Sequence, residues 1–272
     1  MENLGLVLLF AALLASGAPP DVRDIVRRSA AAIEADFRAA PEFSYIDKDI
    51  TQKLDSQDRA LSVSSETYKI TMIDGSPYRR LVARDGEPVS GQEQAREEEK
   101  LQAATERRRR ESPGARQRRI AKFNKSREDD AGMMREMTRA FTFTLHGEQM
   151  VNGRQVYVLD AKPNPSYRPP NEKARALTGM EGKLWIDKQT CQWVKVVAEV
   201  IHPVSFGLIV ARLEPGTRII LEQMPVEEGI WLTKRLEVKL SARYLFLFGH
   251  RSDEEDDYSG YERIGRPIGD RR

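Results

Sequence analysis

Three histidines and one cysteine are the side chains in this sequence that could carry chemistry. His146, His202 and His250 lie far apart, and no two of them have the helical HExxH spacing of a zinc site. Cys191 falls in a predicted turn beside Trp193, and a single cysteine excludes a disulfide within the chain. The sequence also has no phosphate-binding glycine loop and no nucleophile elbow. It therefore predicts neither an enzyme nor a metal or cofactor site.

Basic side chains gather in one segment. The chain has 44 Lys and Arg against 42 Asp and Glu, so its net charge of +2 says little about partners. The local cluster predicts a docking patch for an anionic partner, either a membrane surface or an envelope protein. The alternative is a solvated helix face that neighbouring glutamates neutralise. The patch consists of Arg107, Arg108, Arg109, Arg110, Arg118 and Arg119.

The amino-terminal residues indicate export. Leu4–Ala15 is an apolar run with the length of a signal-peptide core, and it is short for a membrane span. Residues 1–18 are expected to be a signal peptide, cleaved after Gly17 or Ala18, although no Lys or Arg precedes the run. An uncleaved anchor or a buried helix is the alternative. The mature protein is expected to be soluble and periplasmic, where it meets no nucleic acid.

After Pro20 the sequence predicts one helix and then strands. Val22–Phe37 has apolar residues at helical spacing, and its apolar stripe needs a sheet to cover it. Three hairpins follow, with turns at Asp74-Gly75, Asn152-Gly153 and Lys188–Thr190. These hairpins pair Leu61–Ile73 with Tyr78–Arg84, Ala140–Leu145 with Val156–Val158, and Lys183–Asp187 with Trp193–Ile201. Later strands are predicted at Ser205–Arg212, Thr217–Gln223, Ile230–Leu240 and Arg243–Phe248.

Two segments differ from this strand pattern. Ser90–Asp130 is charged and rich in helix formers, which predicts two surface helices or a mobile excursion. The segment from Arg251 is polar and is expected to dock only through Tyr258, Tyr261 and Ile264. We therefore expect one domain over residues 19–265, with a charged helical insertion at about residues 90–130 and a polar tail at 266–272.

The strands predict the fold class. Their short links favour antiparallel pairing of neighbours, and long strands in a wide sheet must twist and curl. We predict a mainly β (α+β) fold, a single strongly curved antiparallel sheet that forms a half-barrel, with an N-terminal helix and a helical lid.

Several strands are apolar on both faces, which is more apolar surface than one helix can cover. The excess either fills a closed or two-layer core or forms a concave surface for a ligand, and the pattern alone does not separate these alternatives. The residues expected to line such a cavity are Phe141, Phe143, Leu145, Leu184, Ile186, Val194, Val196, Leu232, Leu236 and Val238.

Three features of the chain resemble the periplasmic lipoprotein-carrier superfamily. They are the helix at Val22–Phe37, the hairpin at Leu61–Arg84, and the segment Gly182–Asp187 followed by Trp193-Val194-Lys195. That superfamily includes outer-membrane lipoprotein-sorting chaperones, their membrane-anchored receptor and a sigma-E regulatory sensor. The resemblance implies a half-open barrel with helices as a lid, in which acyl chains bind on the concave apolar face. The chain departs from the family in the Ser90–Asp130 segment, and it lacks the receptor's lipidated cysteine.

We therefore predict a periplasmic carrier or chaperone that binds acyl chains of a lipid or lipoprotein. One alternative is an envelope sensor that regulates a membrane partner through protein contact. Another is a structural envelope protein without a ligand. An open apolar cavity on the inner face of the sheet would favour the carrier, and a filled interior would favour the structural protein.

Overall fold

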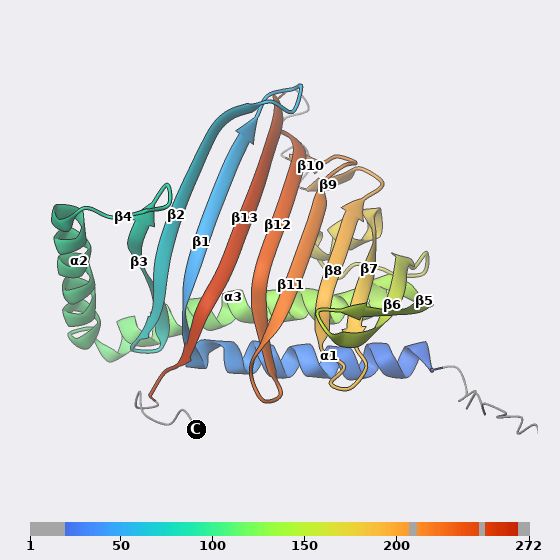
Figure 1. Ribbon diagram of the computed structural model, residues 1–272, viewed down its shortest axis with the longest axis horizontal. Helices are drawn as coiled ribbons and strands as arrows, with labels where there is room; N and C mark the ends of the chain where they lie inside the picture. Colours follow the sequence, from blue (N-terminus) through green and yellow to red (C-terminus); the bar gives the residue numbers. More distant parts are fainter. Residues whose placement is uncertain (1–19, 207–210, 245–247, 266–272) are drawn as a thin grey trace, which may run out of the picture.

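One antiparallel sheet organises the molecule (Figure 1). The structure is a computed structural model that describes residues 20–206, 211–244 and 248–265, so the expected signal peptide and polar tail lie outside it. In this described part, thirteen strands join one open sheet with helices across one face. The sheet is the curved half-barrel that the sequence predicts. Its strands are β1 (Phe43–Leu54), β2 (Ala60–Ile73), β3 (Ser76–Arg84), β4 (Glu87–Pro88), β5 (Phe141–Val151), β6 (Arg154–Pro163), β7 (Met180–Asp187), β8 (Trp193–Val200), β9 (Val204–Phe206), β10 (Ala211–Leu213), β11 (Arg218–Glu227), β12 (Ile230–Tyr244) and β13 (Phe248–Arg263).

The strand order is β4-β3-β2-β1-β13-β12-β11-β8-β7-β6-β5. The three predicted hairpins are confirmed as β2–β3, β5–β6 and β7–β8. Two of them turn through a pair of residues with positive φ, as tight hairpins require. The φ angles are 44° and 83° at Asp74-Gly75, and 50° and 77° at Asn152-Gly153.

Helices begin where the capping residues predict. Asp21 accepts a hydrogen bond from the Arg23 amide at 2.9 Å and starts α1 (Val22–Ala39). After α2 (Gly91–Arg109), Ser112 caps α3 (Pro113–Ala140), which has proline in its first turn. The remaining helical turns are η1 (Ala40–Glu42), α4 (Glu172–Arg175) and η2 (Ala176–Gly179).

Helix α3 is longer than the charged segment that predicted it. The sequence places the end of the insertion near Asp130, whereas α3 continues to Ala140, directly before β5. Its last turns carry Met133, Met134 and Met137, which pack against the main core. The carboxyl-terminal part of the predicted surface helix is therefore structural cover for the sheet.

The core lies between the sheet and the helices α1 and α3, which cross the strands on one face (Figure 1). Ile25 and Ile33 of α1 contribute to it from the helical side. A smaller cluster lies on the opposite face, because side chains alternate along each strand. That second cluster consists of Val156, Val158, Val194 and Trp231.

The segment from Arg251 corrects the sequence analysis. It was expected to be a loosely docked tail, but it forms most of β13, which lies between β1 and β12 in the middle of the sheet. Its acidic residues did not resemble a strand because their partners are cations on the neighbouring strand. Arg235 lies 2.7 Å from Glu255, and Lys239 lies 3.7 Å from Asp253.

Two other predicted strands are also wrong. Ser205–Arg212 is not one strand, because its ends belong to β9 and β10, which pair with each other. Arg243–Phe248 spans the end of β12 and the start of β13, whose residues Tyr244 and Phe248 pair directly. In both places one apolar run of the sequence includes residues of two different strands, so its pattern indicates a single strand.

The burial of α1 gives a test of the fold. Ile33 is 2% exposed beneath the helix, so Ile33→Ala should lower the free energy of unfolding by about 2–5 kcal/mol. Leu61 is 70% exposed, and Leu61→Ala should change it by less than about 0.5 kcal/mol. Urea unfolding of both variants measures the two values, and equal effects would contradict the packing of α1 on the sheet.

Candidate ligand-binding face

The concave face carries continuous rows of apolar side chains. In the strand register, residues directly opposite each other point to the same face. One row runs across six strands, from β5 to β12, through Leu145, Leu159, Leu184, Val196, Leu221 and Leu236. The next row contains Phe143, Ala161, Gly182, Ala198, Ile219 and Val238.

Six of the ten predicted cavity residues therefore share two rows of one face. Phe141 and Ile186 belong to the same core cluster. Val194 does not, because it lies in the cluster on the opposite face. Leu232 is buried near the start of β12. The sequence could not separate Val194 from Val196 in this respect, because an irregularity in the β7–β8 register at Trp185 and Ile186 shifts the alternation.

The middle of this apolar face is covered more completely than its edges, where Phe143 and Leu145 on β5 are half-buried. Leu184, Ile186 and Val196 are almost completely buried, because α1 and the methionines of α3 fill the space above them. Toward β12 the cover is incomplete, and Leu236 and Val238 are only half-buried. The chain's own helices thus cover the most apolar part of the face.

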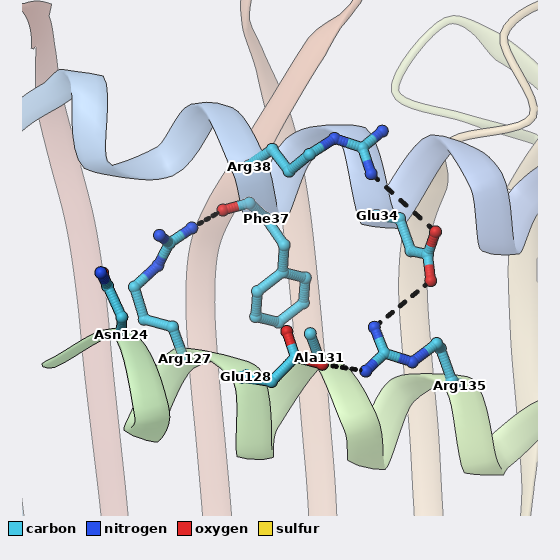
Figure 2. A pocket seen from close by; sticks show the side chains of 8 residues that line it. All are labelled: Glu34, Phe37, Arg38, Asn124, Arg127, Glu128, Ala131 and Arg135. Carbon is cyan, nitrogen blue, oxygen red and sulfur yellow. Dashed lines mark hydrogen bonds and ion pairs between the residues drawn. The ribbon is translucent and has the colours of Figure 1, made fainter. Parts of the chain in front are cut away.

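A groove marks the seam between α1 and α3 (Figure 2). The Phe37 side chain points from α1 toward α3, and Arg127 donates a hydrogen bond to the Phe37 carbonyl. Glu34 joins the helices through Arg135 at 3.5 Å, and Arg135 also pairs with Glu128 on its own helix. These ion pairs are exposed, so each contributes little to holding the helices together.

Asp36 attaches α1 to the sheet. Its Oδ1 accepts hydrogen bonds from the Trp231 amide at 2.9 Å and from Gln192 Nε2 at 3.3 Å. The residue is 3% exposed, and Oδ2 has no hydrogen-bond partner in the described part of the chain. Burial raises the pKa of this carboxyl from its ordinary 3.8 to about 6, and the two hydrogen bonds only partly oppose the rise.

Beyond β12 the concave face changes from apolar to acidic. The row that contains Leu236 continues through Asp256 on β13 and Asp49 on β1. Asp47 lies two residues from Asp49, and Arg79 pairs with these two carboxylates at 3.3 and 3.7 Å. Burial, together with the neighbouring Asp47 and Asp49 charges, raises the pKa of Asp256 to about 6.

Tyrosine rings surround these carboxylates. The Tyr45 ring centre lies 5.3 Å from that of Tyr261 and 5.9 Å from that of Tyr258. Arg79 stacks on Tyr68, with its guanidinium carbon 4.1 Å from the ring centre. The sequence analysis missed this acidic and aromatic end. The alternating Tyr45, Asp47 and Asp49 were a signal of one strand face, but their partner Asp256 lies more than 200 residues away.

The Gly182–Asp187 segment has a structural explanation. A Cβ on Gly182 would lie 2.4 Å from the Val197 carbonyl oxygen, so the close approach of β8 requires glycine there. Asp187 Oδ1 accepts hydrogen bonds from the amides of Gln189 and Thr190, at 3.0 and 2.8 Å, and fixes the β7–β8 turn. Arg154 donates to Asp187 Oδ2 at 3.3 Å and stacks on Trp231.

The six predicted docking arginines have two different roles. Arg108 and Arg119 point inward and hold the helices to the β2–β3 turn. Arg108 donates to the carbonyl oxygens of Ile73, Ser76 and Pro77 at 2.9–3.0 Å. The other four are exposed to solvent, namely Arg107, Arg109, Arg110 and Arg118.

The histidines and the cysteine are not brought together. His146 Nδ1 lies 2.9 Å from Asp160 Oδ2 at the sheet surface. Cys191 is buried, and burial raises the pKa of its thiol, which disfavours the reactive thiolate. Among the described residues there is no group of three or more His, Cys, Asp or Glu side chains arranged to hold a metal ion. None of the helices described combines the length and the apolar character needed to cross a bilayer.

The fold and the face together define a class, an open antiparallel sheet whose apolar concave face is covered by helices. No protein-family model matches the chain, and no curated protein matches it.

Solved structures do match the chain. It is similar to a DUF1329 family protein from Desulfovibrio piger, with 12% identity, a TM-score of 0.35, and coverage of 92% of this chain and 96% of that one. It is similar to a LolA superfamily protein from Nitrosomonas europaea, with 12% identity, a TM-score of 0.32, and coverage of 92% and 96%. MucB of Pseudomonas aeruginosa, solved in complex with MucA, matches with 11% identity, a TM-score of 0.24, and coverage of 88% and 94%.

One of these neighbours is named as a member of the superfamily that the sequence motifs resemble. At TM-scores of 0.24–0.35 the matches carry no inference about what this chain binds. The fold is given by the strand order and register described above.

The pKa of Asp36 gives a second test. Because the folded protein binds the proton of the Asp36 carboxyl more tightly than the unfolded chain does, the contribution of Asp36 to stability is fully present below about pH 4. It is lost as the pH rises through about 6, when the buried carboxylate becomes charged. Asp36→Asn keeps an acceptor for the Trp231 amide without the charge, so it should gain stability relative to the native chain over this window. Urea unfolding as a function of pH measures the difference in the free energy of unfolding between the two proteins. A difference that is constant with pH would contradict a buried Asp36 carboxyl with a raised pKa.

Proposed function

We propose that the protein is a periplasmic carrier or chaperone that shields an acyl chain of a lipid or lipoprotein on its concave face. One observation carries this proposal: two rows of apolar side chains line a concave sheet that is covered by helices instead of a second sheet. Over these rows α1 and α3 contact the sheet mainly through apolar side chains. Apolar contacts have no fixed direction, so an apolar ligand can replace them.

The residues of the cover fit this role. Met133, Met134 and Met137 lie over the apolar rows, and methionine side chains are flexible enough to repack around a ligand. An acyl chain that enters between the helices and the sheet replaces their apolar contacts with its own. Each buried methylene contributes about 0.8 kcal/mol, so about ten methylenes offset roughly 8 kcal/mol of lost contacts between the helices and the sheet. Binding of this kind needs no catalytic group.

A second candidate function rests on the acidic end of the same face. Arg79 pairs with Asp47 and Asp49, and Asp256 lies opposite Asp49 in the register, among tyrosine rings. This acidic and aromatic arrangement fits the cationic side chains of a polypeptide. An envelope sensor that regulates a membrane partner by protein contact would use this end. A structural protein without a ligand is the third candidate, and the burial of Leu184 and Ile186 beneath α1 and α3 is the observation that favours it.

Lipid binding separates these candidates. The mature protein is purified from an envelope fraction, weighed by native mass spectrometry and extracted for lipid, and a fluorescent fatty acid is titrated into the delipidated protein. The carrier predicts a discrete bound lipid and saturable displacement of the probe. Leu236→Asp and Phe143→Asp place a charge on the half-covered rows, so each should weaken probe binding by at least about tenfold.

Leu61→Asp is the matched control, because it adds the same charge at a position that is 70% exposed. It should leave probe binding unchanged. A native mass without lipid, together with no probe binding, would remove the carrier and leave the protein-contact or structural candidates. Equal losses in all three variants would show that the probe does not occupy the concave face.

A further inference from the structure

The corner where α2 ends and α3 begins concentrates positive charge. Between Glu106 and Lys125 the sequence has nine Lys and Arg and two Asp and Glu, although the whole chain carries only +2. Ser112 and Pro113 make the corner by ending one helix and starting the next. In Figure 1 the corner lies at the edge of the sheet beside β3, at the far end of α3 from β5.

Two half-buried arginines, Arg108 and Arg119, hold this corner on the sheet. Arg108 donates to three carbonyl oxygens of the β2–β3 turn, and burial lowers the pKa of its guanidinium. Arg119 donates to the Asp74 carbonyl at 3.1 Å and to Ser76 Oγ at 2.7 Å. It also forms a two-pronged pair with Glu111, with nitrogen to oxygen distances of 2.7–3.0 Å. The basic segment is therefore a fixed part of the surface, not a mobile excursion.

The remaining cations of the corner lie away from the sheet. On α3, the side chains that contact the β2–β3 turn are Arg116, Arg119 and Ile120. Arg118, Lys122 and Lys125 follow the i, i+4, i+7 spacing of a single stripe, which at 100° per residue lies on the opposite side of the helix.

Helix α2 shows the same division. Arg108 points inward. Two residues turn a helix by about 200°, so Arg110 points outward, and Arg107 and Arg109 lie on either side of Arg110 around the helix. All six of these outward cations are exposed. Arg109 and Arg110 share one acidic neighbour, Glu106, at 3.2 and 3.5 Å, and such exposed pairs bind weakly and exchange readily.

We propose that this corner docks the protein on an anionic bilayer. Six outward cations on a convex helical corner attract a charged surface without any shape complementarity. Phe123 is the one aromatic residue between Glu106 and Lys125. It is half-buried and has the Arg127 guanidinium 5.7 Å from its ring centre, which favours a bilayer over stacked nucleic-acid bases. The inference rests on the proposed carrier function, since acyl chains are taken up and delivered at membranes. Helix α3 would then carry the membrane contact at one end and the cover of the apolar face at the other.

Vesicle cosedimentation tests the proposal. The mature protein is mixed with vesicles of phosphatidylcholine alone or of phosphatidylcholine with phosphatidylglycerol, over a series of salt concentrations. It should sediment with the anionic vesicles, and the binding should weaken as salt increases. The variant R107Q/R110Q/R118Q/K122Q should lower the partition coefficient on the order of 100-fold, since each basic residue near the surface contributes to the attraction.

A control variant of equal charge makes the result specific. R23Q/K53Q/K162Q/K234Q removes four exposed cations elsewhere in the molecule and should retain anionic-vesicle binding. Equal losses in the two variants would overturn the proposal, because net charge alone would then explain binding. Equal binding of the native chain to neutral vesicles, or tighter binding to duplex RNA than to anionic vesicles, would also overturn it.

The fatty-acid probe, titrated without vesicles, keeps the two proposals distinguishable. Both quadruple variants should bind the probe as the native chain does, because none of the replaced residues lies on the concave rows. Vesicle binding without probe binding in the native chain would end the carrier proposal and leave the docking corner in place. Probe binding without anionic-vesicle binding would do the reverse.

Discussion

The structure depends on one connection, which joins the two opposite edges of an open sheet. The chain leaves the sheet at β4 and enters it again at β5, the other edge of the strand order. From β3 to β5 there are nine strand spacings of about 4.8 Å, or roughly 43 Å. The 28 residues of α3 span about 42 Å as a helix, so α3 bridges this distance in one element. A helix that crosses from edge to edge has to lie over one face, and this fixes which face is covered.

The rest of the arrangement follows from that crossing. α1 lies beside α3, and together they cover the apolar rows most completely on β6 to β8. The remaining strands complete the sheet by pairing β1 with β13, which joins the first strand of the chain to the last. On those strands the concave face carries Asp47, Asp49 and Asp256 instead of apolar residues, and Asp47 is only 8% exposed. The acidic half of the face is therefore held by charge pairing, since Arg79 pairs with both Asp47 and Asp49.

The sequence predicted the parts of this fold that depend on local pattern. Asn152-Gly153 and Asp74-Gly75 set their hairpins because positive φ at two successive residues selects those residue types. It failed for β13, whose Asp253 and Glu255 are satisfied by Lys239 and Arg235 on another strand. It failed for the exact set of face residues, because the register irregularity beside Trp193 places Val194 and Val196 in opposite clusters. The inward direction of Arg108 was equally hidden, since its three acceptors are backbone carbonyls that carry no mark in the sequence.

The helical cover is held unevenly, and the unevenness bears on function. At the β3 end, Arg108 and Arg119 fix α2 and α3 through several short hydrogen bonds. Over the apolar rows, α1 is held by its apolar stripe and by Asp36, and the cost of burying the Asp36 charge at neutral pH offsets part of its two hydrogen bonds. Apolar contacts have no fixed direction, so an apolar ligand could replace those over the rows, whereas it could not replace the hydrogen bonds of Arg108 and Arg119. The two ends of α3 therefore differ in kind, with a directed polar attachment at the β3 end and replaceable apolar contacts over the rows. That division is the one that the proposed carrier requires.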